Sequence, residues 1–489
     1  MIDPVATHGR ARAGALALVD LESGQCWTWT EFDRAVNRTA HWLIDSLGPA
    51  SGARIATVAR NHVNLIILQF GCVRAGAIFV PLNWRLAAAE IAVLMEDADP
   101  AILLTDAAFA QSFAGTQHDI AALDALTAAF PDVTPLSDAR RDWDEASTLL
   151  FTSGTTGRPK GVMVSEANAF WGATNFALGN RVSCDSVFLC DMPLFHTAGL
   201  FACARTPIQA GATLLVSRGF DAPTTLARIA DPALGITHYF SVPQMAQMLW
   251  NAPDFTPDML AGLHVYATGG APNPAAQIER FVRAGIAMSD GFGMSETCSN
   301  FGMPVDDADL LVAKAGSIGL PYIAVEARIV DDADRDVPDG DIGELWLRGP
   351  SVTQGYWQQP ETTAAAFTQG WFRTGDATRR DTDGYYFLVD RRKDMFISGG
   401  ENVYPAEVEA AIAHIGDVAE CAVIGVPDDR WGEVGRAYCV AVAGTALDSE
   451  AITAHCRTQL AAYKVPKSII VVETLPRTAS GKVQKHLLR

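Results

Sequence analysis

A loop rich in hydroxyl groups offers the clearest chemistry in this sequence. It covers residues 152–160, directly after the apolar run at 149–151, and it combines four hydroxyl side chains with two glycines and a lysine. Hydroxyl donors, a lysine ammonium and the backbone N–H groups that glycine leaves accessible suit the oxygens of a triphosphate. The predicted phosphate-binding residues are Thr152, Ser153, Gly154, Thr155, Thr156, Gly157 and Lys160.

This loop differs from a Walker A loop, in which a helix N-terminus holds the phosphates. Pro159 disfavours helical backbone at Arg158, and no Gly-Lys-Ser/Thr sequence follows. A plain polar surface loop is the alternative, but it would need neither this density of hydroxyls nor a lysine directly after proline. We therefore expect phosphate binding without a helix at Lys160.

Six further motifs follow the loop along the chain. They lie at residues 192–196 (MPLFH), 267–272 (ATGGAP), 291–296 (GFGMSE), 371–376 (WFRTGD), 390–394 (DRRKD) and 476–482 (PRTASGK). In this order they resemble the core motifs of the adenylate-forming enzymes, which include acyl-CoA synthetases, adenylation domains and luciferases. The resemblance is closest to fatty-acid and aromatic-acid CoA ligases, and it extends over nearly the whole chain.

The resemblance implies an acid–thiol ligase that works in two steps. A carboxylate attacks ATP to give an acyl-adenylate and pyrophosphate, and CoA then takes the acyl group and releases AMP. The first step brings a carboxylate to an anionic triphosphate, so the site must neutralise negative charge. Mg²⁺ and lysine supply the positive charge that does this. The implied cofactors are ATP, Mg²⁺ and CoA as co-substrate. Since the attacking sulfur belongs to the substrate, Cys298 is expected to line the pocket rather than to react.

The resemblance also assigns roles residue by residue. Glu296 matches the Mg²⁺ ligand, although the family more often has Thr at Ser295, and the catalytic residues are Lys482, Glu296 and His196. Asp376, after what reads as a tight Thr-Gly turn, matches the ribose ligand. Besides the phosphate loop, the nucleotide and CoA contacts are Gly269, Gly270, Ala271, Gly291, Phe292, Gly293, Met294, Ser295, Asp376, Arg391, Gly399, Gly400 and Trp431.

Several of these residues have a plainer reading. Without the resemblance, Arg391 is a surface arginine and Lys482 a solvated tail residue; with it, Lys482 swings over the site during adenylation. Lys393 matches the hinge about which the small domain turns. Trp431 and Lys467 resemble CoA contacts, but a part-buried tryptophan and a surface lysine fit almost as well.

The expected acid is hydrophobic. His196 after Pro-Leu-Phe is the acyl-CoA ligase form of its motif, although a histidine that only fills the protein core is an alternative reading of this residue. The sequence shows no acidic residue that would bind the ammonium group of an amino acid. The matching wall residues are small or apolar: Thr197, Ala198, Phe240, Ala267, Gly293, Met294, Cys298 and Met303. We expect a medium-chain fatty acid or an aromatic acid of the benzoate or cinnamate type.

Three other functions stay open at this point. A stand-alone adenylation enzyme would load the phosphopantetheine thiol of a carrier protein instead of CoA. A non-catalytic nucleotide-binding protein would be expected to lack Glu296 or Lys482, and both are present. A luciferase-like oxidation is the remotest of the three.

The amino-acid composition limits the expected binding partners and the expected cellular location. A net charge of −19, from 56 acidic and 37 basic residues, repels polyanions, so nucleic acid is not expected. The nine cysteines form no C-x-x-C pair or zinc spacing, which predicts mostly buried thiols in a reducing compartment. No apolar signal core or membrane segment is visible, so a cytoplasmic protein is expected. A homodimer is left open.

The elements that must position these motifs are mostly parallel strands and helices. Eight β-branched runs alternate with helical patterns at 54–58, 77–81, 101–105, 149–152, 187–190, 212–217, 237–242 and 263–268. Thr28 and Glu31 read as a capping box that starts a helix. After residue 320, strands at 325–330, 342–347 and 385–389 predict an antiparallel region.

The predicted fold is therefore α/β with two domains. Residues 1–390 form a large AMP-binding domain of two helix-covered, mostly parallel sheets and a distorted β-barrel region. Residues 391–489 form a small, mobile α+β domain, with a helix at 405–415 and strands near 422–426 and 438–442, and the hinge lies near 390–393.

Overall fold

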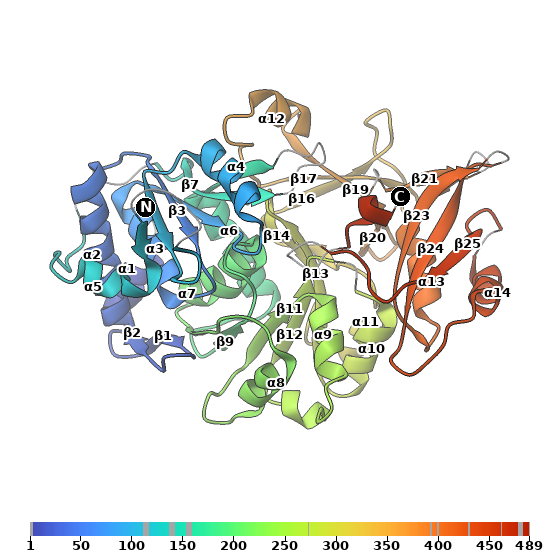
Figure 1. Cartoon of the computed structure of the whole chain (residues 1–489), viewed down its shortest axis with the longest axis horizontal. Coiled ribbons are helices and arrows are strands. Elements are labelled where there is room, and N and C mark those ends of the chain that lie inside the picture. Colours follow the sequence, from blue (N-terminus) through green and yellow to red (C-terminus); the bar gives the residue numbers. More distant parts are fainter. Residues whose placement is uncertain are drawn as a thin grey trace.

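Two large sheets form the body of the molecule (Figure 1). The computed structural model describes residues 3–110, 117–135, 142–152, 159–271, 273–391, 394–398, 401–428, 431–460, 462–477 and 483–488. The first sheet has the order β15-β14-β13-β12-β11-β9-β10-β1-β2 and the second β6-β5-β3-β4-β7-β8. Most of their strand pairs are parallel, as predicted, and antiparallel pairs occur toward the edges.

The strands of the first sheet are β1 (Leu16–Asp20), β2 (Cys26–Thr28), β9 (Val187–Cys190), β10 (Thr213–Val216), β11 (His238–Ser241), β12 (Val265–Gly269), β13 (Met288–Met294), β14 (Cys298–Gly302) and β15 (Leu320–Pro321). Those of the second are β3 (Arg54–Val58), β4 (Ile78–Leu82), β5 (Ile102–Thr105), β6 (Gln117–Asp119), β7 (Ala146–Thr152) and β8 (Lys160–Ser165). All eight β-branched runs of the sequence therefore form strands.

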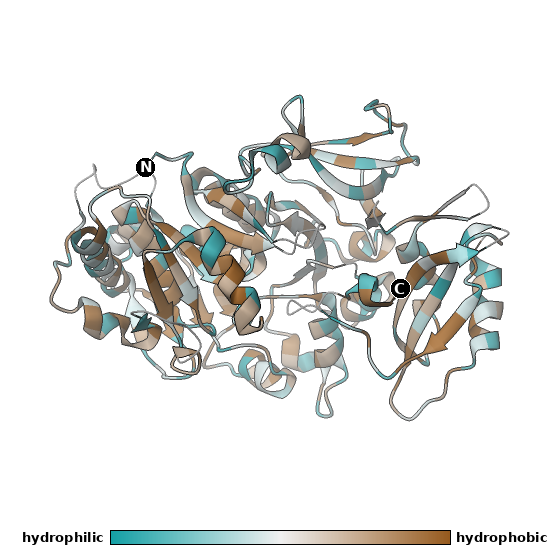
Figure 2. Cartoon of the chain, turned by 45° about the horizontal axis from the view of Figure 1, so that its top comes forward, coloured by the Kyte–Doolittle hydropathy of each residue, from teal (hydrophilic) through white to brown (hydrophobic). Residues whose placement is uncertain are grey.

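Helices cover these sheets. They are α1 (Pro4–Ala11), α2 (Trp29–Leu47), α3 (Val63–Ala75), α4 (Ala88–Ala98), α5 (Leu123–Thr127), α6 (Glu166–Gly179), α7 (Thr206–Ala210), α8 (Ala222–Ala230), α9 (Pro243–Trp250), α10 (Ala275–Arg283) and α11 (Ala308–Ala313). Thr28 and Glu31 do form the predicted capping box at the start of α2. The main core packs α2, α3 and α6 against strands of both sheets, and brown, apolar ribbon marks these strands in Figure 2.

A third, antiparallel sheet completes the large lobe. It contains β16 (Glu326–Val330), β17 (Ile342–Arg348), β18 (Phe367–Thr368), β19 (Trp371–Arg380) and β20 (Tyr386–Arg391), with α12 (Pro360–Ala366) beside it. A fourth sheet begins with β21 (Phe396–Ser398) and belongs to a smaller lobe at the C-terminal end of the chain (Figure 1). We call residues from 396 onward the small lobe.

The small lobe has its own core. Its strands are β21, β22 (Glu401–Val403), β23 (Val418–Asp428), β24 (Gly432–Ala441) and β25 (Ser468–Val471), and its helices are α13 (Pro405–Ala413) and α14 (Ser449–Gln459). Phe396, Val408 and Ile452 are among the apolar side chains that pack together inside it. A separate core supports the α/β fold with a second, smaller domain.

Two further expectations concern the whole chain. All nine cysteines are free thiols, and six of them are buried, as expected for small apolar residues. Within the described ranges, no helix is long and apolar enough to cross a membrane.

Candidate active site

A deep cleft collects the described members of the predicted site. It encloses about 3720 Å³, several times the roughly 300–1,000 Å³ of an ordinary ligand pocket, so a nucleotide and an acid fit together. Both lobes line it. The predicted residues on its wall are Thr152, Lys160, His196, Gly269, Gly270, Ala271, Gly291, Phe292, Gly293, Met294, Ser295, Glu296 and Asp376.

The two ends of the predicted phosphate loop line this cleft. Thr152 ends β7 and Lys160 begins β8, and the two residues face each other in the antiparallel pair. Because Lys160 starts a strand, the predicted absence of a helix at this lysine is confirmed. Ser153, Gly154, Thr155, Thr156 and Gly157 lie outside the described residues.

Tyr356 connects this lysine to the predicted Mg²⁺ ligand. The Lys160 ammonium lies 5.0 Å from the centre of the Tyr356 ring, and the Tyr356 hydroxyl donates a hydrogen bond of 3.0 Å to Glu296 Oε1. The Thr353 N–H donates to the Glu296 carbonyl at 2.6 Å, which fixes the backbone as well. No spacing in the sequence links Tyr356 to either motif, so sequence reasoning missed it.

The carboxylate of Glu296 suits Mg²⁺ in one particular way. Among the described residues, no group of three or more His, Cys, Asp or Glu side chains could hold a metal ion. Mg²⁺ in phosphate-transferring sites is usually held by one or two carboxylates, substrate phosphates and water. A lone glutamate beside a phosphate loop fits this pattern, so Glu296 would hold the ion, which would offset phosphate charge.

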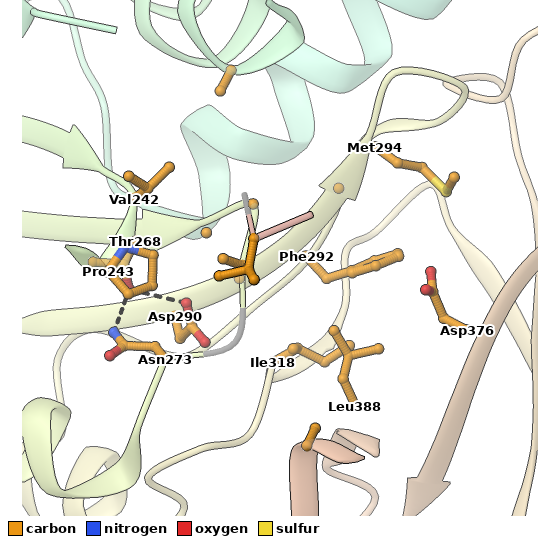
Figure 3. A pocket seen from close by; sticks show the side chains of 18 of the residues that line it. Val242, Pro243, Thr268, Asn273, Asp290, Phe292, Met294, Ile318, Asp376 and Leu388 are labelled. Carbon is orange, nitrogen blue, oxygen red and sulfur yellow. Dashed lines mark hydrogen bonds between the residues drawn. The ribbon is translucent and has the colours of Figure 1, made fainter. Parts of the chain in front are cut away.

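The end of β12 and the middle of β13 line the cleft side by side. Gly269 pairs with Gly291, and Gly270 has a φ of +82°, which suits glycine. Behind them the Asn273 amide donates to Thr268 Oγ1 and the Thr268 hydroxyl donates to Asp290, both at 2.9 Å. Burial raises the pKa of Asp290 to about 8. Figure 3 shows this network on one side of Phe292 and Asp376 on the other.

The sequence places one carboxylate, Asp290, directly before the 291–296 motif. Asp290 lies inside β13, and sequence reasoning did not use its position beside the motif. Asn273 is joined to Asp290 only through the Thr268 hydroxyl, and sequence reasoning missed it because it belongs to no predicted site.

The tight turn expected before Asp376 is wrong. Residues Thr374, Gly375 and Asp376 lie inside the continuous strand β19 and form a bulge, because all three oppose Leu345 of β17. Gly375 has a φ of +71°, and the Thr374 hydroxyl donates to the Leu345 carbonyl at 2.7 Å. The bulge turns Asp376 into the cleft, opposite Arg391 in the β19–β20 register. The Arg391 side chain lies outside the described residues.

His196 lies half-buried on the cleft wall, two residues before the π-helix at Ala198–Arg205. The buried Asn61 side chain fixes the loop that precedes His196. Asn61 Nδ2 donates to the Met192 carbonyl and Asn61 Oδ1 accepts from the Leu194 N–H, both at 2.9 Å. This clamp was not predicted, since Asn61 belongs to no motif.

Most predicted wall residues surround the same cleft. Thr197, Ala198, Phe240, Ala267, Gly293, Met294 and Cys298 line it. Met303 does not, because it packs in a second core with Leu311 and Tyr385 on the other face of the sheet. Burial raises the pKa of the Cys298 thiol to about 12, which agrees with an unreactive wall residue.

The C-terminal candidates are only partly described. Gly399, Gly400, Lys393 and Lys482 lie outside the described residues. Trp431 is described and does not line the cleft, but the Lys467 ammonium lies 5.6 Å from the centre of its ring. The two candidate CoA contacts therefore lie together on the small lobe.

Polar contacts hold the small lobe against α9. The Gln244 amide donates to Glu420 Oε1 at 2.9 Å, and Arg477 donates to Glu420 Oε2 at 2.6 Å. The Gln247 amide also donates to the Ala419 carbonyl at 3.3 Å. Such side-chain contacts can be exchanged with water at low cost.

Two family models match the chain. Residues 5–357 match the AMP-binding enzyme model, and residues 407–482 match the model of the AMP-binding enzyme C-terminal domain. The chain therefore belongs to the AMP-binding, adenylate-forming enzyme family, as the seven ordered motifs predict.

Characterised relatives refine this class. The chain is 37% identical over 484 residues to a feruloyl-CoA synthase of Amycolatopsis sp, covering 98% of this chain and 97% of the relative. It is 33% identical over 472 residues to the long-chain-fatty-acid–CoA ligase FadD13 of Mycobacterium tuberculosis, covering 94% and 92%. The o-succinylbenzoate CoA synthetase (MenE) of Bacillus subtilis, solved with ATP and magnesium ion, matches with a TM-score of 0.88 and 29% identity over 99% and 98%.

These matches over nearly the full length identify the activity class. The protein is an AMP-forming acyl-CoA synthetase, an acid–thiol ligase that uses ATP and CoA. Loading of a carrier protein is not favoured, because these relatives are named for CoA.

Proposed function

We propose that this enzyme activates a flat, hydrophobic carboxylic acid, with an aromatic acid of the benzoate or cinnamate type preferred over a medium-chain fatty acid. The observation that carries this choice is a sheet surface made of glycine and alanine. Ala267 and Gly269 of β12, Gly291 of β13 and Gly302 of β14 lie next to one another on the same face.

Aromatic side chains close this space from the side. The Phe240 ring of β11 lies 3.4 Å from the place of a Cβ at Gly269, and its centroid lies 5.9 Å from that of Phe176 of α6. Added bulk on the sheet side has no room: a Cβ at Gly269 would lie 3.0 Å from the Gly291 carbonyl oxygen, and a Cβ at Gly291 would lie 2.8 Å from the Phe301 carbonyl oxygen. A bare sheet face beside aromatic rings suits a planar ring more closely than a flexible chain.

We assign the binding of ATP and Mg²⁺ to the motif residues. In our proposal the loop at 152–160 and Lys160 bind the triphosphate, Glu296 holds Mg²⁺, and Asp376 binds the ribose. The acid carboxylate then attacks the α-phosphorus, the bond to the pyrophosphate oxygen breaks, and Lys482 stabilises the charge that builds up on the α-phosphate. His196 borders the acyl group near the new anhydride.

The second step needs a different arrangement. The CoA thiol attacks the acyl carbonyl, the bond to the AMP oxygen breaks, and no enzyme nucleophile takes part. We propose the domain boundary at 390/391 and the hinge at 390–393, which is supported because β20 ends the third sheet at Arg391 and β21 starts the fourth at Phe396. The contacts that Gln244 and Gln247 of α9 make with the small lobe are exchangeable, which favours such a rotation. Gly399, Gly400 and Trp431 are the proposed CoA contacts.

Pyrophosphate release tests the substrate class. The enzyme would be assayed with ATP, Mg²⁺ and single acids (octanoate, decanoate, benzoate, cinnamate and 4-hydroxycinnamate), with and without CoA, and acyl-CoA would be quantified by chromatography. We expect the highest kcat/KM with an aromatic acid, and repeated turnover only when CoA is present. A reaction without acid measures the background.

Three results would change this conclusion. A higher kcat/KM for the alkanoates would assign the enzyme to fatty acids. Acyl-adenylate that forms but does not react with CoA would exclude CoA as the acceptor. Release that does not depend on any of the acids would place the substrate outside both classes.

A further inference from the structure

The bare sheet face ends at three polar side chains. Ser289 precedes Gly291 by two residues on β13, so both side chains lie on the same face. Asn180 follows α6 directly and faces Ser289, and each of these residues is only 4% exposed. Tyr322, two residues after the start of β15, is the third. All three line the cleft.

Tyr322 reaches this place because two glycines make room for it. A Cβ at Gly302 would lie 2.0 Å from the Tyr322 hydroxyl oxygen, and a Cβ at Gly179 would lie 2.1 Å from a ring carbon. Gly302 belongs to the bare face and pairs with Gly291, so the hydroxyl lies over one end of the face where we place the substrate ring. The Tyr322 N–H is fixed by the Asn300 carbonyl at 2.8 Å.

The three groups bind one another only weakly. Asn180 Nδ2 donates to the Tyr322 hydroxyl at 3.4 Å, and the Ser289 hydroxyl donates to Asn180 Oδ1 at 3.5 Å. Both distances exceed the usual 2.7–3.2 Å of a good hydrogen bond. Asn180 Nδ2 is better satisfied by the Phe176 carbonyl, at 3.0 Å.

Hydrogen-bonding capacity is therefore left over at this end of the cleft. In the described part of the chain, the Tyr322 hydroxyl accepts one hydrogen bond and has no acceptor for its own proton. Burial raises the pKa of Tyr322, so the hydroxyl keeps this proton. Buried polar groups with spare capacity cost stability unless a ligand pairs with them.

We propose that Asn180, Ser289 and Tyr322 recognise a hydroxyl group at the end of the acid farthest from its carboxylate, so that the preferred substrate is a hydroxylated aromatic acid. This inference rests on the aromatic substrate proposed above. A substrate hydroxyl accepts a hydrogen bond from the Tyr322 hydroxyl and donates one to Ser289 or Asn180. An alkyl end would fill the same space and offer no acceptor to the Tyr322 hydroxyl.

One pair of substrates isolates the hydroxyl. Cinnamate and 4-hydroxycinnamate differ only in this group, so the ratio of their kcat/KM values in acyl-CoA formation measures its recognition. We expect a preference of about 10-fold or more for the hydroxylated acid, since a site built to bind a hydroxyl discriminates strongly against the analogue without it.

Two conservative variants locate the recognition. Tyr322→Phe and Ser289→Ala should each reduce the preference several-fold by lowering kcat/KM for 4-hydroxycinnamate, while kcat/KM for cinnamate stays within about twofold. Tyr266→Phe is the matched control, because Tyr266 is also buried and shares a 2.9 Å hydrogen bond with Ser241, but belongs to the core on the opposite face. It should leave the preference unchanged, and thermal unfolding of each variant checks that it folds.

Each outcome decides between the two proposals. Equal kcat/KM for the two acids in the unmodified enzyme would overturn the hydroxyl site and leave the aromatic substrate intact. A preference that survives in both variants would place the recognition elsewhere and overturn these three residues. If neither acid is activated while the alkanoates are, the aromatic assignment fails and the hydroxyl site fails with it.

Discussion

The Tyr356 hydroxyl is the described group whose removal should reveal most about the metal site. It donates to Glu296 Oε1 at 3.0 Å, and the two residues are only 6% and 8% exposed, so water has little room to replace it. Tyr356→Phe removes this oxygen and keeps the ring under Lys160.

The expected loss follows from the chemistry of the contact. A hydrogen bond to a charged group contributes about 1.5–3 kcal/mol, which corresponds to roughly 10- to 150-fold in kcat/KM for MgATP. Tyr356→Leu also removes the ring from the Lys160 ammonium, 5.0 Å away. A cation–π contact adds about 0.5–2 kcal/mol, so the leucine variant should lose roughly another 2- to 30-fold.

Initial rates of pyrophosphate release at saturating acid and varied MgATP would measure both losses. Tyr385→Phe is the matched control, because a lysine, Lys314, lies at the same 5.0 Å over its ring, and Tyr385 does not line the cleft. It should stay within about twofold of the unmodified enzyme. If Tyr356→Phe also stays within twofold, Glu296 does not need this hydroxyl and the reasoning is refuted.

Two further predictions concern Asp290 and Lys482. Burial holds the pKa of Asp290 at about 8, against an ordinary value of 3.8. Between pH 5 and 8 the folded protein therefore keeps a proton on this carboxyl that the unfolded chain has lost. As a result, the free energy of unfolding falls by up to about 1.4 kcal/mol for each pH unit as the pH rises from 5 to 8. Urea unfolding should show this slope missing in Asp290→Asn, and parallel pH profiles would contradict the assignment. Lys482→Ala should abolish acyl-adenylate formation yet leave thioester formation from supplied acyl-adenylate largely intact, and equal loss in both assays would contradict the proposed role.

Much of the fold could be predicted from the sequence because local patterns carried it. The β-branched runs all became strands, and the capping box at Thr28 and Glu31 opened α2. The prediction failed where strand pairing between distant parts of the chain determined the local backbone conformation. A Thr-Gly pair reads as a turn, but pairing of β19 with β17 kept Gly375 inside a strand as part of a bulge.

The site was predictable only where residues belong to motifs. Lys160, Glu296 and Asp376 reached the same cleft as expected. Tyr356 and Asn61 were missed because each acts on a motif far away in the chain, and nothing local marks them. Met303 was misplaced for a related reason: Cys298 and Phe301, earlier on the same stretch of chain, line the cleft, while the Met303 side chain packs in the core on the other face of the sheet.

The two glycines around Tyr322 have a consequence for reading mutational data. A methyl group at Gly179 or Gly302 would lie within 2.1 Å of the tyrosine side chain, so both positions should reject every other residue in a saturation scan. They would then score like catalytic positions although they perform no chemistry. Their intolerance is conditional, because a smaller residue at 322 would remove the obstacle. Epistasis with residue 322 therefore separates a glycine required for space from one required for catalysis.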